Sequence, residues 1–198
     1  MTLKAPIMTP EQFDVWVLRP ENADKSYEFI AGEIVEKMVS NQRSAQIGAK
    51  ILTFIMLHAM QHDLGRATGE QGGYMINGER YMPDVAYMSY ARQPIDNDDA
   101  YNPLAPDLVV EVLSPSDSPR ETRVKVANYL AAGTVIWVVS PDDEQIEIYV
   151  PGQRVRLLGI EDTLDGGAIL PGFTLSLETI FKRRTDTDSQ TNLPDAES

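Results

Sequence analysis

The segment Asp107–Leu113 constrains the fold of this chain most, because an acidic residue stands in the middle of what should be a core strand. Its sequence, DLVVEVL, is rich in β-branched residues and is bounded by Pro106 and by Ser114-Pro115, which predicts a buried strand. Burying the Glu111 carboxylate is costly unless it is paired, protonated or bound to a cation. Glu111 is therefore a candidate site residue.

The residues after this strand predict a helix that carries a positive charge. Ser118 is a suitable N-cap, Pro119 suits the first helical position, and Glu121 completes a capping box at the third. Lys125 and Tyr129 then lie one turn apart on the same side of the helix. A strand acid followed by a cation on the next helix has the arrangement of a functional site.

The length and composition are those of an ordinary globular protein. The 198 residues, 42% hydrophobic and 24% charged, are enough to bury a core, and we expect a single domain over residues 1–181. Residues 182–198 are polar, which predicts a disordered C-terminal tail. The chain has no cysteine and only two histidines, so any metal should be held by carboxylates, which favours Mg²⁺ or Mn²⁺.

The charge balance is acidic, with a formal net charge of −13 from 30 acidic and 17 basic residues. This balance disfavours tight nonspecific binding to nucleic acid, which depends on Lys and Arg neutralising phosphates, although a local basic patch can act on an acidic molecule. No stretch approaches the roughly 20 apolar residues of a membrane span, and the N-terminal residues lack a long apolar core. The expected location is the cytoplasm, with no membrane partner.

Hydrophobic periodicity and turn residues predict an alternation of helices and strands around one mixed sheet, an α/β or α+β arrangement. The expected elements are a helix opening at Thr9-Pro10, strands Tyr27–Ile30 and Glu33–Glu36 joined by Ala31-Gly32, a helix Ser44–Leu64 closed by Gly65, strands Arg66–Ile76 and Tyr81–Met88 joined at Asn77-Gly78, a loop Ala91–Pro106, the strand Asp107–Leu113, the helix from Pro119 to Gly133, a strand Thr134–Ser140, a hairpin of Glu144–Val150 and Gln153–Leu158, and a short helix Leu177–Phe181.

Three carboxylates stand on strands that are expected to be neighbours. Asp84 follows Pro83 early in one strand, Glu111 lies in the next, and Glu33 begins an earlier one. Adjacent strands are about 4.8 Å apart, so acids that share one face can hold one or two divalent ions between them. Such ions polarise a phosphodiester and acidify a bound water, and a nearby ammonium stabilises the developing charge.

These motifs together resemble one family. The parts of the pattern are Pro83-Asp84-Val85, the segment Pro106–Ser116, Lys125 and Tyr129, and Gly133 before Ile136-Trp137-Val138. The pattern resembles the Uma-two family of bacterial endonucleases, in the PD-(D/E)XK nuclease superfamily, over roughly Tyr27 to Phe181. The resemblance implies a restriction-endonuclease-like α/β fold, in which a mixed central sheet is flanked by helices.

The resemblance also implies roles for residues of this chain. Asp84 and Glu111 match the two metal-binding acids, which the backbone carbonyl of Val112 would join. The superfamily's usual lysine would stand two residues after Glu111, where this chain has Leu113. Families of this type supply the lysine from the following helix, and the matching residue here is Lys125.

Tyr129 would support Lys125, and Glu33 is the expected third metal ligand, with Glu28 and Glu70 as competitors. The activity implied by the resemblance is that of a Mg²⁺-dependent endonuclease, with Mn²⁺ as an alternative ion and DNA as the substrate. A homodimer is consistent with this activity because cleavage of a duplex needs two cuts.

Other interpretations of the same residues remain open. The chain can be a non-catalytic nucleic-acid or protein interaction module on the same fold, or a hydrolase of another phosphoester. Glu111 can form a purely structural ion pair with Arg123 or Lys125, because structural networks also bury carboxylates. Asp84 after Pro83 can simply cap a turn.

Several further polar residues are assigned to surface or turn positions. They are His58 and His62, which lack the pattern of a metalloprotease; Ser114, Ser116 and Ser118, which have no histidine nearby in sequence; and Asp96, Asp98 and Asp99, which lack the glycine and terminal Glu of a calcium loop.

Overall fold

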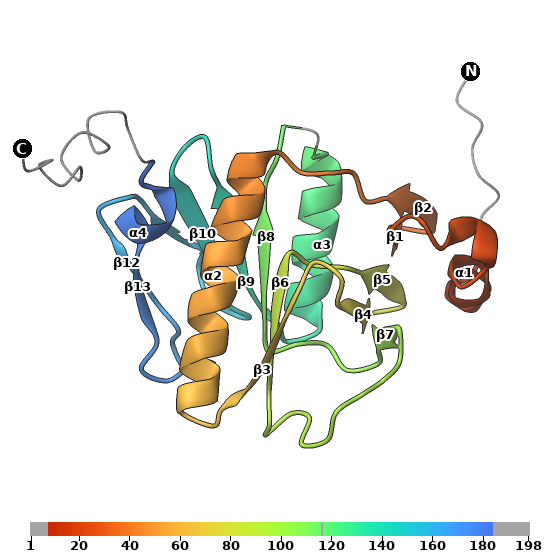
Figure 1. The fold of residues 1–198 in the computed structure, drawn as a ribbon, viewed down its shortest axis with the longest axis horizontal. Coiled ribbons are helices and arrows are strands. Elements are labelled where there is room, and N and C mark those ends of the chain that lie inside the picture. Colours follow the sequence, from red (N-terminus) through yellow and green to blue (C-terminus); the bar gives the residue numbers. More distant parts are fainter. Residues whose placement is uncertain (1–7, 116, 184–198) are drawn as a thin grey trace, which may run out of the picture.

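A six-stranded mixed sheet forms the centre of the molecule. The computed structural model describes residues 8–115 and 117–183. The strand order is β11-β10-β9-β8-β6-β3, in which β8 and β9 are parallel and the other neighbours are antiparallel. The strands are β3 Gly65–Gly69, β6 Val85–Ser89, β8 Leu108–Val112, β9 Val135–Ser140, β10 Gln145–Tyr149 and β11 Arg156–Leu158. The predicted buried strand is thus β8, which lies between β6 and β9 (Figure 1).

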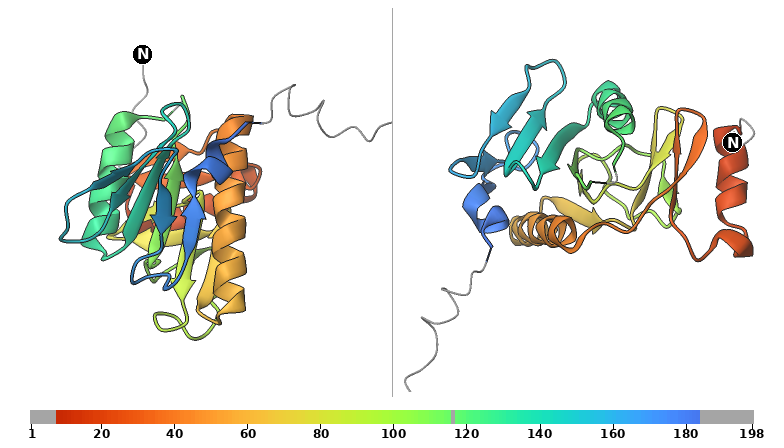
Figure 2. Two further views of the ribbon diagram at one scale, coloured as in Figure 1. Left: turned by 90° about the vertical axis from the view of Figure 1, so that its left-hand side faces the viewer. Right: turned by 90° about the horizontal axis from the view of Figure 1, so that it is seen from above.

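Two long helices cover opposite faces of this sheet (Figure 2). Helix α2, Gln42–Gln61, packs on the face that carries Val110 and Val112, and helix α3, Pro119–Ala131, packs on the face that carries Val109. The period of two residues in β8 explains the division, because successive side chains of a strand point to opposite faces. Glu111 therefore shares its face with Val109 and α3. The expectation of an α/β fold with a mixed central sheet flanked by helices is confirmed.

A second sheet lies beside the first. It has five strands in the order β2-β1-β5-β4-β7, namely β1 Tyr27–Ile30, β2 Glu33–Glu36, β4 Gly73–Ile76, β5 Glu79–Tyr81 and β7 Tyr101–Asn102. Helix α1, Pro10–Val17, and the short helix η1, Pro20–Asn22, lie at its outer side, and Phe13 of α1 packs against Phe29 of β1. The last elements of the described part are a small hairpin, β12 Thr163–Asp165 and β13 Thr174–Ser176, and helix α4, Leu177–Phe181.

Helices α1 and α3 begin where the capping residues predict them, whereas α2 begins at Gln42 after an Asn41 cap, two residues before the predicted Ser44. The Thr9 hydroxyl accepts a hydrogen bond from the backbone N–H of Gln12 in a complete capping box, and the Ser118 hydroxyl accepts one from the N–H of Glu121 at the start of α3. The C-terminal end of α2 differs from the prediction. The helix ends at Gln61, Asp63 takes a positive φ of 53°, and Gly65 is the first residue of β3 instead of the cap.

The prediction of one mixed sheet was wrong, because two predicted strands are each divided between the two sheets. The expected strand Arg66–Ile76 becomes β3 and β4, which are separated by a turn at Gly72, where a Cβ would come within 2.5 Å of Thr68 Oγ1. The expected strand Tyr81–Met88 becomes β5 and β6, interrupted at Pro83, which has no N–H to donate to a ladder. These breaks let the chain pass from one sheet to the other.

Two smaller expectations are also corrected. The predicted loop Ala91–Pro106 contains β7, which pairs in parallel with β4, and the hairpin of β12 and β13 was not predicted at all. The tail predicted for residues 182–198 falls outside the described residues from position 184 onward. Among the described residues, no helix is both long and apolar enough to cross a membrane.

Candidate metal and catalytic site

A cavity of about 240 Å³ lies where the two sheets meet the N-terminal half of α3. It is lined by side chains of the β1–β2 hairpin and the segment after it, by the link between β5 and β6, by the C-terminal end of β8, and by α3. The polar residues among them include Glu28, Glu36, Lys37, Ser40, Asp84, Glu111, Ser114, Asp117, Ser118, Glu121, Thr122 and Lys125. Residues that are far apart in the sequence thus meet in one space.

The pairing of β6 with β8 places Asp84 and Glu111 opposite each other. The ladder ends with Val85 opposite Val110, so continuing the register by one residue sets Asp84 opposite Glu111. Asp84 Oδ2 accepts a hydrogen bond of 2.8 Å from the backbone N–H of Val112, which fixes the carboxylate at the end of β8. The break at Pro83 is what frees the Asp84 side chain from the regular pleat of the strand.

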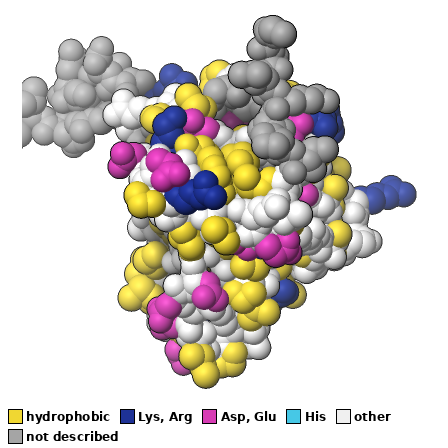
Figure 3. Space-filling view, turned by 90° about the vertical axis from the view of Figure 1, so that its right-hand side faces the viewer, with side chains coloured by type: hydrophobic (Ala, Val, Ile, Leu, Met, Phe, Trp, Pro, Cys, Tyr) yellow, Lys and Arg dark blue, Asp and Glu magenta, His cyan; other side chains and the backbone are white. Residues whose placement is uncertain are grey.

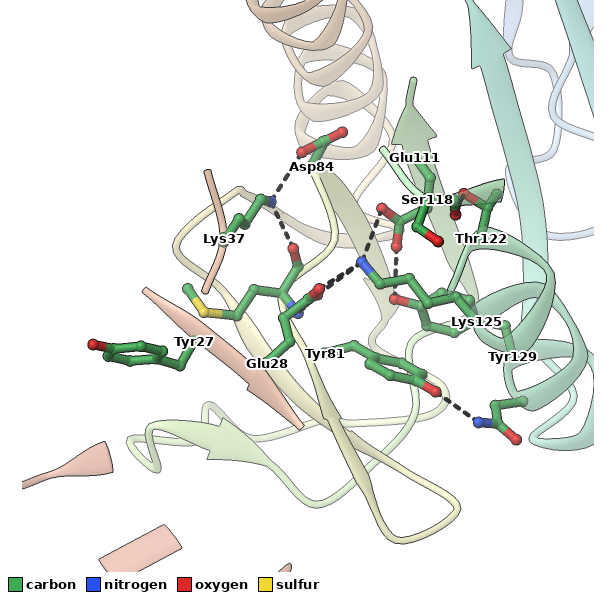
Figure 4. Close-up of polar contacts among 12 residues, drawn as sticks. Tyr27, Glu28, Lys37, Tyr81, Asp84, Glu111, Ser118, Thr122, Lys125 and Tyr129 are labelled. Atoms are coloured by element: carbon green, nitrogen blue, oxygen red, sulfur yellow. Dashed lines mark hydrogen bonds and ion pairs between the residues drawn. The ribbon is translucent and has the colours of Figure 1, made fainter. Parts of the chain in front are cut away.

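Lys125 bridges two buried carboxylates (Figure 4). Its Nζ lies 2.7 Å from Glu28 Oε2 and 3.6 Å from Glu111 Oε2, and its side chain is only 14% exposed. Glu28 also accepts a 2.7 Å hydrogen bond from the backbone N–H of Met82. The structure therefore brings together the predicted pair of Glu111 and Lys125, and adds Glu28 as the closer partner of the ammonium.

Burial makes Glu111 a weaker acid than an exposed glutamate. Loss of solvent raises the pKa of Glu111 to about 7; Lys125 opposes this shift, whereas the negative charges of Asp84 and Glu28 reinforce it. Tyr129, fully buried in α3, donates a 3.0 Å hydrogen bond to Glu111 Oε1. The pKa of Tyr129 is itself raised, first by burial and then by the charge of Glu111, so its hydroxyl keeps its proton.

Lys125 remains charged in this environment. Burial alone would lower the pKa of its ammonium, but Glu111 and Glu28 outweigh burial, so that the pKa lies above its usual value. The ammonium also lies 5.7 Å from the centre of the Tyr81 ring, and the Tyr81 hydroxyl accepts a hydrogen bond from Asn128 of α3. Lys125 is thus a fixed positive charge at the wall of the cavity.

Lys37 is a second cation of the site, and the sequence interpretation missed it. Its Nζ donates to Asp84 Oδ1 at 2.9 Å and to the backbone carbonyl of Met82 at 2.7 Å. Lys37 follows β2 directly, in a segment whose sequence carries no site motif, so no local signal marks it. Glu28 was named only as a competitor of Glu33, although it is an acid within an apolar strand, the same signal that marked Glu111.

Glu33, the expected third metal ligand, lies outside the cavity. Glu33 pairs with Ile30 next to the turn of the β1–β2 hairpin, is exposed to solvent, and does not line the cavity. The competitor Glu28 lines the cavity instead, two residues before Ile30 on the other strand of the hairpin. Glu70, the other competitor, is exposed at the turn between β3 and β4 and lines a neighbouring hollow that Asp84 and Val112 also border.

The other polar candidates lie away from the cavity or shape its rim. The rings of His58 and His62 are tilted against each other near the end of α2, with centroids 4.5 Å apart, and His58 Nε2 hydrogen-bonds to the carbonyl of Pro171. Asp96, in the loop between β6 and β7, forms an ion pair with Arg66 of β3. Ser114 and Ser118 line the rim of the cavity, where Ser118 caps α3 as predicted; Ser116 lies outside the described residues.

The acids that line the cavity suit a metal ion that takes few of its ligands from the protein. In the described part of the chain, no three carboxylate or histidine side chains are close enough together to hold one metal ion. Mg²⁺ is commonly bound through one or two carboxylates, with waters and substrate phosphates completing its shell. Asp84 and Glu111 fit that pattern. Burial is the main cause of the raised pKa of Glu111, the charges of Asp84 and Glu28 add to it, and a bound cation would oppose the shift.

On the face of the molecule shown in Figure 3, the described residues form no large patch of one charge. Figure 3 views the side of the molecule that carries α1 and the β1–β2 hairpin, and it shows acidic side chains spread among hydrophobic ones with a few basic groups. Within the cavity, the acids Glu28, Glu36, Asp84, Glu111, Asp117 and Glu121 face the two lysines. A phosphate would therefore enter this cavity only with additional positive charge.

The fold and the paired acids define a restriction-endonuclease-like protein, and the comparisons agree. The chain is similar to the crystal structure of "a putative nuclease belonging to DUF820" from Anabaena variabilis, with a TM-score of 0.77 and 21% identity over 88% of this chain and 97% of that one. Residues 10–178 match the model of the Uma2 family, described as "Putative restriction endonuclease", and the chain belongs to that family. Among curated proteins, none matches this chain significantly.

Proposed function

We propose that this chain is a metal-dependent endonuclease that hydrolyses phosphodiester bonds of DNA. Membership of the Uma2 family supports a nuclease function. The observation that carries the proposal is the meeting of Asp84 and Glu111 at the ends of neighbouring strands, with the Lys125 ammonium 3.6 Å from Glu111 in one cavity. Two acids and a fixed cation are the groups that metal-assisted phosphodiester hydrolysis requires.

Asp84, Glu111 and the backbone carbonyl of Val112 would hold Mg²⁺ or Mn²⁺. When bound, the ion would supply a polarised phosphoryl oxygen and an acidified water. The Val112 N–H orients Asp84, and Tyr129 orients Glu111, so both carboxylates are held in place before an ion arrives. Because Glu111 has a raised pKa, it must give up its proton to bind a cation.

Lys125 would act on the charge that develops on the phosphoryl group. Its ammonium is held by Glu28 at 2.7 Å and cannot swing away easily, so it costs little reorganisation during the reaction. Glu28 is therefore a positioning residue, which sets where the ammonium lies. This division of roles explains how the site works with Leu113 at the usual position of the superfamily's lysine.

The direct test is cleavage of supercoiled plasmid DNA by the purified protein. Nicking is expected with Mg²⁺ or Mn²⁺, loss of nicking with EDTA, and loss in Asp84→Asn. Asp165→Asn is the matched control, because Asp165 also forms an ion pair with one cation but is half-exposed and remote from the cavity. An interaction module would bind DNA or protein without cutting, and that result would overturn the proposal.

The substrate class is tested in the same preparation. Single-stranded RNA and bis-(p-nitrophenyl) phosphate, offered beside the plasmid, separate a DNA endonuclease from a ribonuclease and from a general phosphodiesterase. Sedimentation with and without duplex DNA tests the expected homodimer. Efficient hydrolysis of the small ester with no attack on DNA would assign the site to another phosphoester.

A further inference from the structure

The longest helix of this acidic protein contains no acidic residue. None of the 20 residues of α2 is Asp or Glu, whereas α1, α3 and α4 each carry at least one. In a chain with 30 acidic residues among 198, about three would be expected by chance in a segment of this length. The solvent-facing positions of its first half include neutral residues at Gln42, Ala45, Gln46 and Ala49.

One flank of this helix borders a basic hollow of about 450 Å³. We use the name basic hollow for the space lined by Arg43, Gln46, Ile47 and Lys50 of α2 and by Ile180, Phe181, Lys182 and Arg183 at the end of α4. Four of these eight residues are cationic. Neither hollow described above concentrates positive charge in this way, since the catalytic cavity is lined by six acids and two lysines, and the hollow beside Glu70 has no cation.

The cations of the basic hollow are only partly neutralised. Arg43 Nη2 donates hydrogen bonds to the Glu144 carboxylate and to the Pro141 carbonyl. Its Nε and Nη1 are buried and have no hydrogen-bond partner among the described residues. Lys50 donates to the carbonyls of Thr179 and Ile180, which carry no full charge. Lys182 pairs with Glu178 at 3.4 Å, an exposed contact that is weak in water.

The opposite flank of α2 leads to the catalytic acids. A second hollow, lined by Ser44, Gly48 and Leu52 of α2, shares Asp84 and Val112 with the catalytic cavity. The N-terminal half of α2 thus separates the basic hollow from the cavity, and Figure 1 shows α4 on one side of its upper half and β8 with α3 on the other. A helix with side chains is about 10–12 Å across, close to the roughly 12 Å width of the DNA major groove.

We propose that the basic hollow and the carboxylate-free first half of α2 form the surface that holds the phosphate backbone of duplex DNA while a phosphate enters the catalytic cavity. This inference rests on the proposed function. The positive end of the α2 dipole adds to the attraction, because α2 has no acidic residue in its first turn to oppose it. It also explains how a chain of net charge −13 holds a polyanion: the favourable charge is local.

The sharpest test inserts one carboxylate at either end of the same helix. Gln46→Glu places the charge beside the basic hollow, and Gln61→Glu makes the same exchange at the exposed far end, about 22 Å away along the axis. The carboxylate introduced by Gln46→Glu would lie one turn from both Arg43 and Lys50, so it should stabilise the isolated helix. A purely structural role for these cations therefore predicts unchanged DNA binding and a slightly higher melting temperature in Gln46→Glu.

The measurement is the anisotropy of a labelled duplex of about three helical turns, with Ca²⁺ replacing Mg²⁺, over a range of salt concentrations. Gln46→Glu should weaken the Kd by about tenfold, and Gln61→Glu should leave it unchanged. Lys182→Gln with Arg183→Gln should lower the slope of log K against log salt by about two, one for each phosphate that is no longer neutralised. Arg156→Gln, also an exposed cation, is the matched control for charge removal.

The outcomes separate this inference from the proposed function. If the unaltered protein cuts and binds DNA but Gln46→Glu binds equally well, only the inference is overturned. Equal weakening by Gln46→Glu and Gln61→Glu would show a general effect of net charge and would also overturn it. If the unaltered protein binds no duplex, both the inference and the proposed function fall.

Discussion

The Nζ of Lys37 lies 2.9 Å from Asp84 Oδ1, on the oxygen that the backbone does not already hold. The other oxygen, Oδ2, accepts from the Val112 N–H, so Oδ1 is the atom available to a cation. A divalent ion bound at Asp84, as proposed, would therefore compete with Lys37 for the same oxygen. The ion pair is partly exposed, with side chains 20% and 24% accessible, which makes the competition a modest one.

Replacing Lys37 tests this competition. In Lys37→Met, the Kd for Mn²⁺ should tighten by about fivefold, because an ion pair of this exposure contributes up to roughly 1 kcal/mol. Isothermal titration calorimetry measures the change. Lys182→Met, which breaks an exposed ion pair elsewhere, should leave the Kd unaltered. Weaker Mn²⁺ binding in Lys37→Met would mean that Lys37 supports the ion instead of competing with it.

Replacing Lys125 should harm both stability and catalysis, and the two effects can be separated. Lys125→Met leaves Glu28 buried without its ion-pair partner, which should cost about 3 kcal/mol of unfolding free energy. Single-turnover cleavage should fall by about 10²-fold or more, the scale seen when one preorganised donor is lost. Urea denaturation and a cleavage assay measure the two quantities.

The double variant Glu28→Gln with Lys125→Met provides the control for this prediction. Removing both charges should restore most of the stability and none of the cleavage, because the catalytic ammonium is still missing. Recovery of cleavage together with stability would show that Lys125 has only a structural role. A rate equal to that of the unaltered protein in Lys125→Met would remove Lys125 from the mechanism.

The buried acid Glu111 predicts how stability depends on pH. Its folded-state pKa is raised from 4.5 to about 7, so the folded protein binds a proton more tightly than the unfolded chain does. The stability that the proton on Glu111 contributes is fully present below about pH 4.5 and is lost as pH rises through about 7. In EDTA, Glu111→Gln should therefore gain stability relative to the unaltered protein between about pH 5 and pH 8, by up to about 3 kcal/mol.

Urea denaturation at these two pH values measures the gain. Glu178→Gln, which removes an exposed carboxylate, should show no such dependence on pH. An equal effect of Glu111→Gln at the lower and the higher pH would contradict the assignment of a protonated Glu111 near neutrality.

Tyr129 is expected to tune the protonation of Glu111. Its hydroxyl donates to Glu111 Oε1, so Tyr129→Phe removes a hydrogen bond that favours the ionised carboxylate. The pH at which Mn²⁺ binding is half-maximal should move upward by roughly one unit. Tyr74→Phe is the matched control, because Tyr74 is also buried but its hydroxyl bonds to Thr68. An unchanged pH profile in Tyr129→Phe would leave Tyr129 a packing residue only.

The sequence alone was sufficient for the parts of this protein that depend on local pattern. β8 followed from its β-branched run, the start of α3 from Ser118 and Pro119, and the buried carboxylate of Glu111 from an acid within an apolar strand. These predictions succeeded because side-chain periodicity, capping and the cost of burying charge act over a few neighbouring residues. The pattern of motifs also identified the family correctly.

Only the tertiary structure decided how the two sheets share the chain and which charges meet. The breaks at Gly72 and Pro83 are short, and nothing local distinguishes a turn within one sheet from a crossing into another. Glu28 lines the cavity and Glu33 does not, and Lys37 pairs with Asp84, because register and hairpin orientation set which side chains enter a cavity. Such contacts join residues 47 to 97 positions apart, and their free energy depends on geometry that forms only when the whole chain has folded.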